Sequence, residues 1–218
     1  MVRTMFDSKL IDLNNEMTVM GALCEEAIKT AVKALVDYDT AAEKSVRESC
    51  VLIDRKEKQI EDICLKLLLH EQPVARDLRT VTAALKMIYD MERIGDQAED
   101  VAQTAKYITK SDLKGKTQVN EMGEAAAKMV TRAIDSFVKR DLLTAKEVID
   151  ADDEVDDAFN RVKKELCELM KKGETDAEGL LDVLMAAKYI ERIADHAVNI
   201  AYWVEYLITG VHSDSLQF

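Results

Sequence analysis

Apolar residues recur along this chain with a period of about 3.6 residues, which is the repeat of an α-helix. Polar and charged residues fill the positions between them, and the alternation typical of β-strands is hard to find. The pattern therefore predicts long amphipathic helices, each burying one stripe. In the first helix the stripe is formed by Met17, Met20, Cys24, Ala27, Ile28, Ala31 and Leu35.

Recognisable signals delimit the next two helices. Asp39 or Thr40 can cap the second helix, where Thr40 and Glu43 form a capping-box pattern. Pro73 ends this helix, because the residue before a proline is driven out of the helical region. A third helix is predicted over 76–109.

The pattern then restarts with three more helices. The fourth is predicted over 117–139, and Asp141 can cap the fifth, which ends near Gly173. A second capping box, formed by Thr175 and Glu178, opens the sixth helix.

The restart is an internal repeat. Shifting the first half by 102 residues superposes the pairs Met20-Gly21 on Met122-Gly123 and Ile53-Asp54 on Val155-Asp156. A shift of 99 superposes Glu92-Arg-Ile-Gly-Asp96 on Glu191-Arg-Ile-Ala-Asp195 in the third helix of each copy. The repeat predicts an all-α fold of two tandem three-helix bundles, six long helices in all, related by a pseudo-two-fold. The first repeat covers 1–110, a linker 111–116, and the second repeat 117–218.

Composition narrows the class of protein. The net charge is −12 and no basic patch is visible, which argues against nucleic-acid binding and favours a basic partner surface. No segment approaches the ~20 apolar residues that span a bilayer, and the N-terminus has no apolar signal core. Cys24, Cys64 and Cys167 fall among apolar helical positions, so we expect buried, reduced thiols and a cytoplasmic protein.

Rows of carboxylates on the two third helices are the candidate chemistry. Acids four residues apart repel each other, and the apolar stripe beside them raises the cost of each charge. A cation between them would offset both effects, and oxygen ligands suit hard or borderline ions such as Mg, Mn, Ca or Fe. The candidate metal ligands are Glu92, Asp96 and Asp100 in the first copy, and Glu191, Asp195 and Asn199 in the second.

Two alternatives stay open. In a metal-free helical scaffold, Arg93 would pair with Asp96 and Arg192 with Asp195, each within one helix. In a metal-storage or redox protein the carboxylates would hold iron, but the Glu-x-x-His motif of di-iron carboxylate proteins is absent. The sequence contains no recognisable catalytic motif, so we predict no enzymatic activity and no catalytic residue.

The segments around the two carboxylate rows resemble those of a known protein family. The segments Arg76 to Asp96 and Tyr189 to Ala201 resemble the signature of PhoU proteins, and the resemblance extends over essentially the whole chain. It implies a cytoplasmic homodimer of six-helix subunits that negatively regulates the phosphate regulon. It also implies two partners, the ATPase subunit of the phosphate ABC transporter and a membrane sensor histidine kinase, which would provide the only link to a membrane.

The resemblance further implies multinuclear iron or zinc clusters on the ExxxD motifs, as in some members. This chain departs from symmetry, because Asn199 stands where the first copy has Asp100. Acids on the fifth helix, Asp152 and Asp153, correspond to Cys50 and Val51 in the first copy. If the helix before each third helix supplies ligands, the first site is the poorer one.

Overall fold

The structure is a computed structural model that describes residues 2–37, 41–71, 75–108, 118–172 and 177–212. In these ranges the chain forms helices and no strand, which confirms the all-α fold class. The predicted linker at 111–116, Pro73, and the capping residues Thr40 and Thr175 lie outside the described residues. The helices are α1 (Val2–Asp37), α2 (Ala42–Glu71), α3 (Arg76–Ile108), α4 (Val119–Lys139), α5 (Leu142–Asp150), α6 (Asp152–Lys172) and α7 (Ala177–Thr209).

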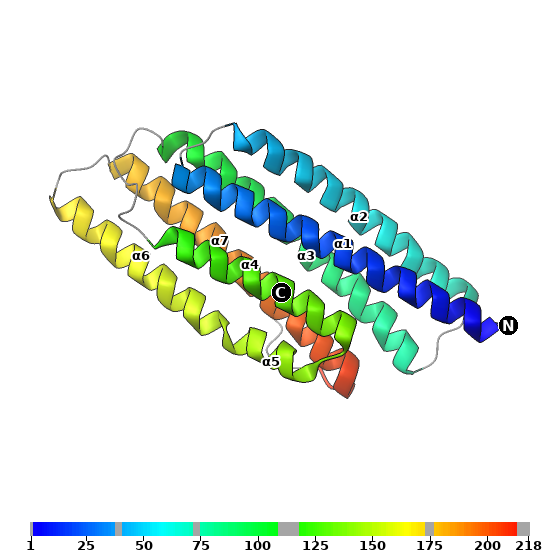
Figure 1. Cartoon of the computed structure of the whole chain (residues 1–218). Coiled ribbons are helices and arrows are strands. Elements are labelled where there is room, and N and C mark those ends of the chain that lie inside the picture. Colours follow the sequence, from blue (N-terminus) through cyan, green and yellow to red (C-terminus); the bar gives the residue numbers. More distant parts are fainter. Residues whose placement is uncertain (1, 38–40, 72–74, 109–117, 173–176, 213–218) are drawn as a thin grey trace.

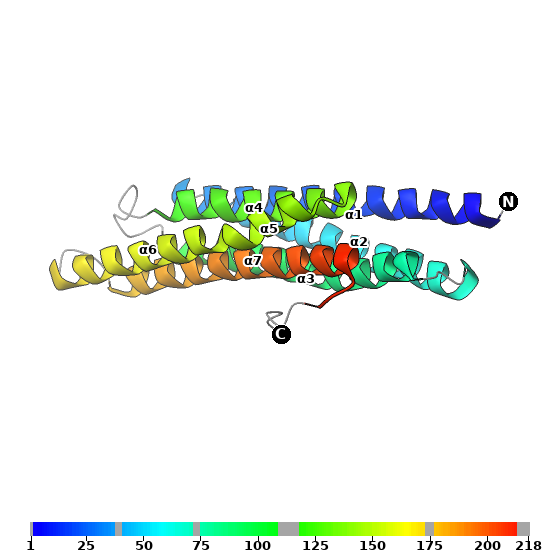
Figure 2. The same ribbon diagram turned by 90° about the horizontal axis from the view of Figure 1, so that it is seen from below.

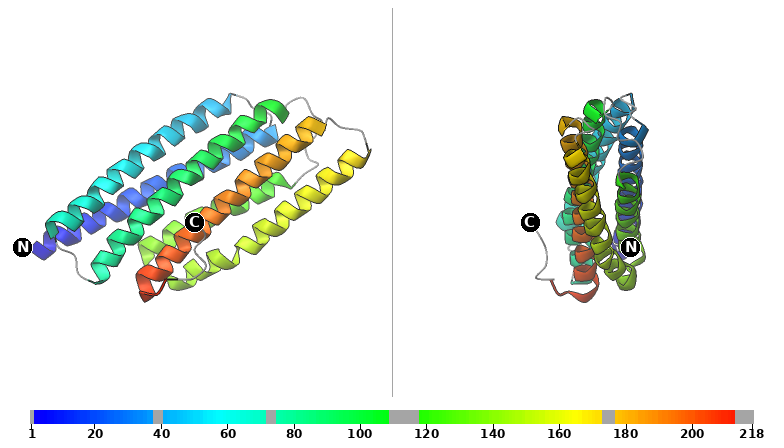
Figure 3. Two further views of the ribbon diagram at one scale, coloured as in Figure 1. Left: turned by 180° about the vertical axis from the view of Figure 1, so that it is seen from behind. Right: turned by 90° about the vertical axis from the view of Figure 1, so that its left-hand side faces the viewer.

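The helices form an elongated, flat molecule of two layers (Figure 1, Figure 2). One layer holds α1 and α4, which pack against each other. The other holds α2, α3, α7 and α6, which lie side by side in that order (Figure 3). The third helices of the two copies, α3 and α7, therefore meet at the centre of this four-helix face.

A single hydrophobic core runs through both repeats. Its largest fully buried side chains include Met17 and Met20 from α1, Met87 and Met91 from α3, and Phe137 from α4. Because the core is continuous across the α1–α4 and α3–α7 contacts, the two repeats share one interior. Trp203 from α7 belongs to this core and is 7% exposed.

The predicted fifth helix is two helices. Asp141 caps α5 as predicted, accepting hydrogen bonds from the backbone N–H groups of Leu143 and Thr144 at 3.0 and 3.2 Å. The helix then breaks at Ala151, whose carbonyl accepts from Glu154 N–H three residues on, a tighter turn than the α-helix. No Gly or Pro marks this break, and a sequence pattern cannot reveal it. The corresponding helix in the first copy, α2, is unbroken.

The thiol prediction needs one correction. Cys24 and Cys64 are buried as expected, but Cys167 is exposed. Its position on α6 turns it away from the core, since α6 packs on only part of its circumference. Cys50, which the pattern did not select, is buried.

Reciprocal glycine contacts bring α1 and α4 close together. A Cβ added at Gly123 would meet both methyl groups of Val32, with Val32 Cγ1 at 2.8 Å. A Cβ added at Gly21 would meet Ile134 in the same way. The shift of 102 residues exchanges the two contacts, as a pseudo-two-fold between the repeats requires.

Replacing Gly123 is therefore expected to destabilise the protein. Alanine gains about 1 kcal/mol in helix propensity, but a clash with the stiff Val32 side chain costs about 1–3 kcal/mol. We expect Gly123→Ala to lower the free energy of unfolding by about 1 kcal/mol, measured by urea denaturation. In a Val32→Ala background the same change should be neutral or stabilising. A loss of equal size in both backgrounds would mean that the α1–α4 contact is not its cause.

Candidate metal centres

The two rows of predicted ligands lie on the outer four-helix face, each beside its neighbouring helix. Site one lies between α3 and α2, and site two between α7 and α6. Glu92 and Asp96 have side-chain exposures of 24% and 41%, so site one is half-buried and open to solvent on one side. The same spacing of four residues places Glu191 and Asp195 at site two.

Site one gathers carboxylates from two helices. Burial raises the pKa of Glu92, and the negative charges of Asp96, Asp54 and Glu57 raise it further. Asp54 and Glu57 come from α2. Burial also raises the pKa of Glu57 itself. Four acids therefore repel one another across the contact between α2 and α3.

A built-in cation offsets part of this repulsion. Arg93 Nη1 lies 2.9 Å from Asp96 Oδ2, and Arg93 Nε lies 3.2 Å from Glu92 Oε2. The ion pair expected between Arg93 and Asp96 in a metal-free scaffold therefore forms. An incoming metal ion would have to displace this guanidinium.

The two other groups near site one, Asp100 and Cys50, are weak or partly buried candidates for metal ligands. Burial raises the pKa of Asp100, and Asp96 and Glu99 add to the effect. Cys50 comes from α2. Its thiol donates to the backbone carbonyl of Gly95 on α3, with Sγ 3.2 Å from the carbonyl oxygen. Burial, followed by the charges of Glu99, Asp96 and Asp54, raises the pKa of Cys50 to about 12. The thiol is therefore protonated and is no ready metal ligand.

Site two contains a small cavity. Its volume is about 180 Å³, and its polar lining consists of Asp152, Asp153, Asp195, Asn199 and Tyr202. Asp152 and Asp153 begin α6, directly after the break at Ala151. The helix break at Ala151 therefore helps to place Asp152 and Asp153 beside α7.

The carboxylates of site two are less compensated than those of site one. Asp152 Oδ1 is buried and has no hydrogen-bond partner among the described residues. Burial raises the pKa of Asp152 to about 6, with further contributions from Asp195, Asp156, Asp153 and Glu191. Burial, followed by the charge of Glu191, also raises the pKa of Asp195.

The predicted pair of Arg192 with Asp195 does not form. Arg192 makes no ion pair with any described residue, and Lys188 pairs with Glu191 instead. The expected ion pair within the third helix therefore forms in the first copy, between Arg93 and Asp96, and does not form in the second. The charge of Arg192 acts on Asp100 across the α3–α7 contact and offsets part of the rise in the pKa of that carboxyl, which burial causes first.

The donor set fits a hard cation. Carboxylate and amide oxygens face a small cavity at site two, and one buried oxygen lacks a partner. Within the described ranges, no three His, Cys, Asp or Glu side chains are already close enough to share one ion. Binding of a metal ion would therefore require the carboxylate side chains to change rotamer. At site one, Arg93 would also have to move away from Glu92 and Asp96.

The sequence also contained a signal for ligands that the ExxxD pattern did not select. Asp54 and Asp156 superpose at the shift of 102 residues, and both follow a buried residue, Ile53 and Val155. An acid that occurs at the same position of both copies, next to a core residue, identifies the side of the neighbouring helix that faces the ExxxD carboxylates.

His196 lies beside site two but faces the other way. Its Nδ1 is 2.9 Å from Asp90 Oδ1, and Asn199 Nδ2 donates to the same oxygen at 3.3 Å. The histidine and the amide therefore bridge α7 to α3. The predicted ligand Asn199 therefore already donates a hydrogen bond to α3, on the side of α7 that faces away from α6.

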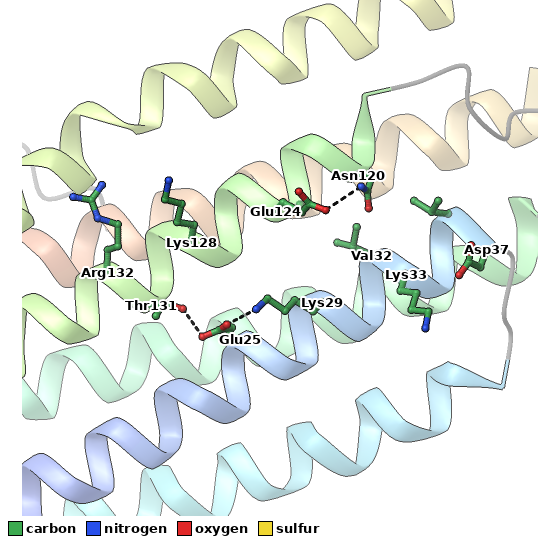
Figure 4. Close-up of a pocket in the computed structure, with 12 residues that line it drawn as sticks. Glu25, Lys29, Val32, Lys33, Asp37, Asn120, Glu124, Lys128, Thr131 and Arg132 are labelled. Atoms are coloured by element: carbon green, nitrogen blue, oxygen red, sulfur yellow. Dashed lines mark hydrogen bonds and ion pairs between the residues drawn. The ribbon is translucent and has the colours of Figure 1, made fainter.

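A larger groove lies on the opposite layer, between α1 and α4 (Figure 4). Its volume is about 760 Å³. Glu25 at its floor accepts from Thr131 at 2.6 Å and pairs with Lys29. Lys33 and Lys128 point to opposite sides of the groove. The charged groups do not converge on one point, so this groove is not a centre for an ion.

Fold and site together define a class: an all-helical protein of two tandem three-helix units, each with a carboxylate row at the outer edge of its third helix. Residues 17–105 and 119–204 each match the PhoU domain. The chain belongs to the PhoU family, as the motifs indicated.

Similar proteins cover nearly the whole chain. The phosphate-specific transport system accessory protein PhoU homolog of Clostridium acetobutylicum is 34% identical, over 98% of this chain and 99% of its own. The homolog of the same name from Pseudomonas aeruginosa is 34% identical, over 94% and 86%. None of the described helices of the present chain has the apolar length that crossing a bilayer requires.

Solved structures agree with the fold. The crystal structure of PhoU from Pseudomonas aeruginosa superposes with a TM-score of 0.85 at 34% identity, covering 94% of this chain and 100% of that one. PhoU from Streptococcus pneumoniae, described as a phosphate transport system regulatory protein, superposes with a TM-score of 0.87 at 27% identity, covering 96% and 99%.

Proposed function

We propose that this chain is a non-catalytic, cytoplasmic regulator of phosphate uptake that represses the phosphate regulon when phosphate is plentiful. The supporting observation is its membership of the PhoU family over both repeats, whose similar members are named accessory proteins of phosphate-specific transport. Its partners would be the ATPase subunit of a phosphate ABC transporter and a membrane sensor histidine kinase. The acidic chain, with net charge −12, suits basic surfaces on such partners and does not suit nucleic acid. It would act as a homodimer.

Metal ions belong to this proposal. Glu92, Asp96 and Asp100, with Asp54 opposite, would hold them at site one. Glu191, Asp195 and Asn199, with Asp152, Asp153 and Asp156 opposite, would hold them at site two. Iron or zinc follows from the family resemblance, and the oxygen donors also suit Mg, Mn or Ca. A bound cation would neutralise the repelling acids and tie α2 to α3 and α6 to α7.

A storage or redox role for iron receives little support from the geometry. Such a role in a helical bundle uses Glu-x-x-His pairs that project together into the interior. Here His196 faces Asp90 on the outer four-helix face, and both carboxylate sites are partly open to solvent.

Deleting the gene is expected to raise expression of phosphate-scavenging genes in phosphate-rich medium. The loss of a repressor removes the signal that keeps the kinase pathway silent, and a plasmid copy should restore repression. Transcript levels in deletion, complemented and parental strains measure the effect. If these genes stay repressed and phosphate uptake is unchanged, the regulatory assignment is wrong.

A further inference from the structure

The contact between α3 and α7 contains a cavity that shares Arg93 and Asn199 with the carboxylate sites but none of their acids. The two helices run antiparallel, because Arg79 near the start of α3 bonds to the carbonyl of Leu207 near the end of α7. The groove between them has a volume of about 720 Å³. This volume lies within the range of about 300–1,000 Å³ that small-molecule sites occupy.

Three cations line this cavity in a chain of strongly negative charge. Lys86 and Arg93 come from α3, and Arg192 comes from α7. Of these, Lys86 and Arg192 make no ion pair with any described residue. Charge that is left unpaired in a pocket is available to a ligand.

Aromatic rings hold two of the cations at the groove. Lys86 Nζ lies 5.9 Å from the centre of the Trp203 ring, and Arg93 Cζ lies 5.2 Å from that of Tyr89. Such contacts favour a side chain over its ring without neutralising its charge. The cations are therefore positioned before any ligand arrives.

A buried polar network forms the floor. Asp90, with a side-chain exposure of 8%, accepts from both His196 and Asn199. Asn199 keeps its other amide hydrogen free for a ligand, whereas His196, whose Nδ1–H donates to Asp90, presents only the Nε2 lone pair when neutral. The acids lining the cavity are Asp90, already hydrogen-bonded twice, and Glu61. Arg93 is already paired at site one, so Lys86 and Arg192 are the cations left for a ligand.

We propose that the α3–α7 groove binds a small phosphate-bearing anion, with Arg192 as its principal ligand and Lys86, Arg93 and Asn199 around it. Guanidinium groups match phosphate oxygens with two parallel hydrogen bonds, which a point charge cannot do. Free orthophosphate and the phosphates of a nucleotide share this chemistry. The groove shares Arg93 and Asn199 with the proposed metal sites, so anion binding is tested in metal-free protein; it requires no regulatory partner.

Calorimetric titration of the full-length protein, freed of metal with a chelator that is then removed, tests the proposal. Orthophosphate, pyrophosphate and ATP are titrated separately in about 0.15 M NaCl, so that non-specific attraction is screened. We expect one saturable site per chain for at least one of them. Binding of orthophosphate identifies a free-phosphate site, and binding of ATP or pyrophosphate alone identifies a polyphosphate site.

Two arginine variants decide where the anion binds. Arg192→Gln should weaken binding by about tenfold or more, the effect of losing a charged hydrogen-bond donor. Arg161→Gln removes the same charge from the exposed surface of α6 and should leave affinity within about twofold. Lys86→Gln provides a second variant in the groove, and circular dichroism checks that each variant folds. The proposal is overturned if none of the three anions saturates, or if Arg192→Gln and Lys86→Gln bind like Arg161→Gln.

Discussion

Removing metal from protein purified without chelator or affinity nickel is expected to lower its melting temperature by about 5–10 °C. A ligand present at 100 times its dissociation constant adds about 2.7 kcal/mol to stability. In a chain of this length, 1 kcal/mol corresponds to about 2–4 °C. The effect follows from the proposed metal sites, where an ion neutralises carboxylates that repel one another when it is absent. Differential scanning fluorimetry before and after chelation, with elemental analysis of the same samples, measures it.

The two sites should contribute unequally to this difference. At site one Arg93 already pairs with Glu92 and Asp96 and offsets part of their charge, so a metal ion gains less there. At site two the carboxyls of Asp152 and Asp195 have raised pKa values caused by burial and by neighbouring acids. Asp195→Asn should therefore remove more of the chelator-dependent shift than Asp96→Asn.

A matched variant controls for the loss of surface charge. Asp62→Asn removes an acid from α2 that is 60% exposed and, among the described residues, pairs only with Lys66. This change should leave the chelator effect intact. Elemental analysis showing no Fe, Zn, Mn, Mg or Ca above buffer, with melting indifferent to chelator and to added metal, would falsify the metal assignment.

Much of the fold could be predicted because the helical periodicity and the internal repeat can both be recognised in the sequence itself. The buried stripe from Met17 to Leu35 and the cap at Asp141 are examples, since each depends on neighbours a few residues away. The break at Ala151 could not be predicted, because it contains no Gly or Pro. The exposure of Cys167 likewise depends on which side of α6 meets the core.

The candidate site was predictable only along each helix. The spacing of Glu92 and Asp96 places two acids on one face, but which acids face them depends on packing between helices. Asp54 is such an acid, because it reaches the site from α2. The pairing of residues across α3 and α7, such as Asp90 with His196, likewise requires the tertiary arrangement.

Asp152→Asn is expected to change stability in opposite directions with and without metal. In the metal-free protein the pKa of Asp152 is raised from 3.8 to about 6, so the folded state binds its proton more tightly than the unfolded state. The resulting stabilisation is complete below about pH 4 and is lost as the pH rises through about 6. At pH 7.5 the ionised carboxylate therefore opposes folding, and asparagine, which cannot ionise, removes that cost. A shift of this size converts to about 3 kcal/mol, which partial contact with solvent reduces to about 1–2 kcal/mol.

In chelator-treated protein we therefore expect Asp152→Asn to raise the melting temperature by about 2–8 °C at pH 7.5, with little change at pH 4.5. With metal bound the sign reverses, because the ion already offsets the charge and the variant has lost a ligand oxygen. Asp153→Asn serves as the matched control: it lines the same cavity but is exposed, so both effects should be smaller. Melting curves of the three proteins at both pH values, with chelator and with added zinc, iron or manganese, give the comparison. A change of the same sign under both conditions would mean that Asp152 does not contribute to a metal centre.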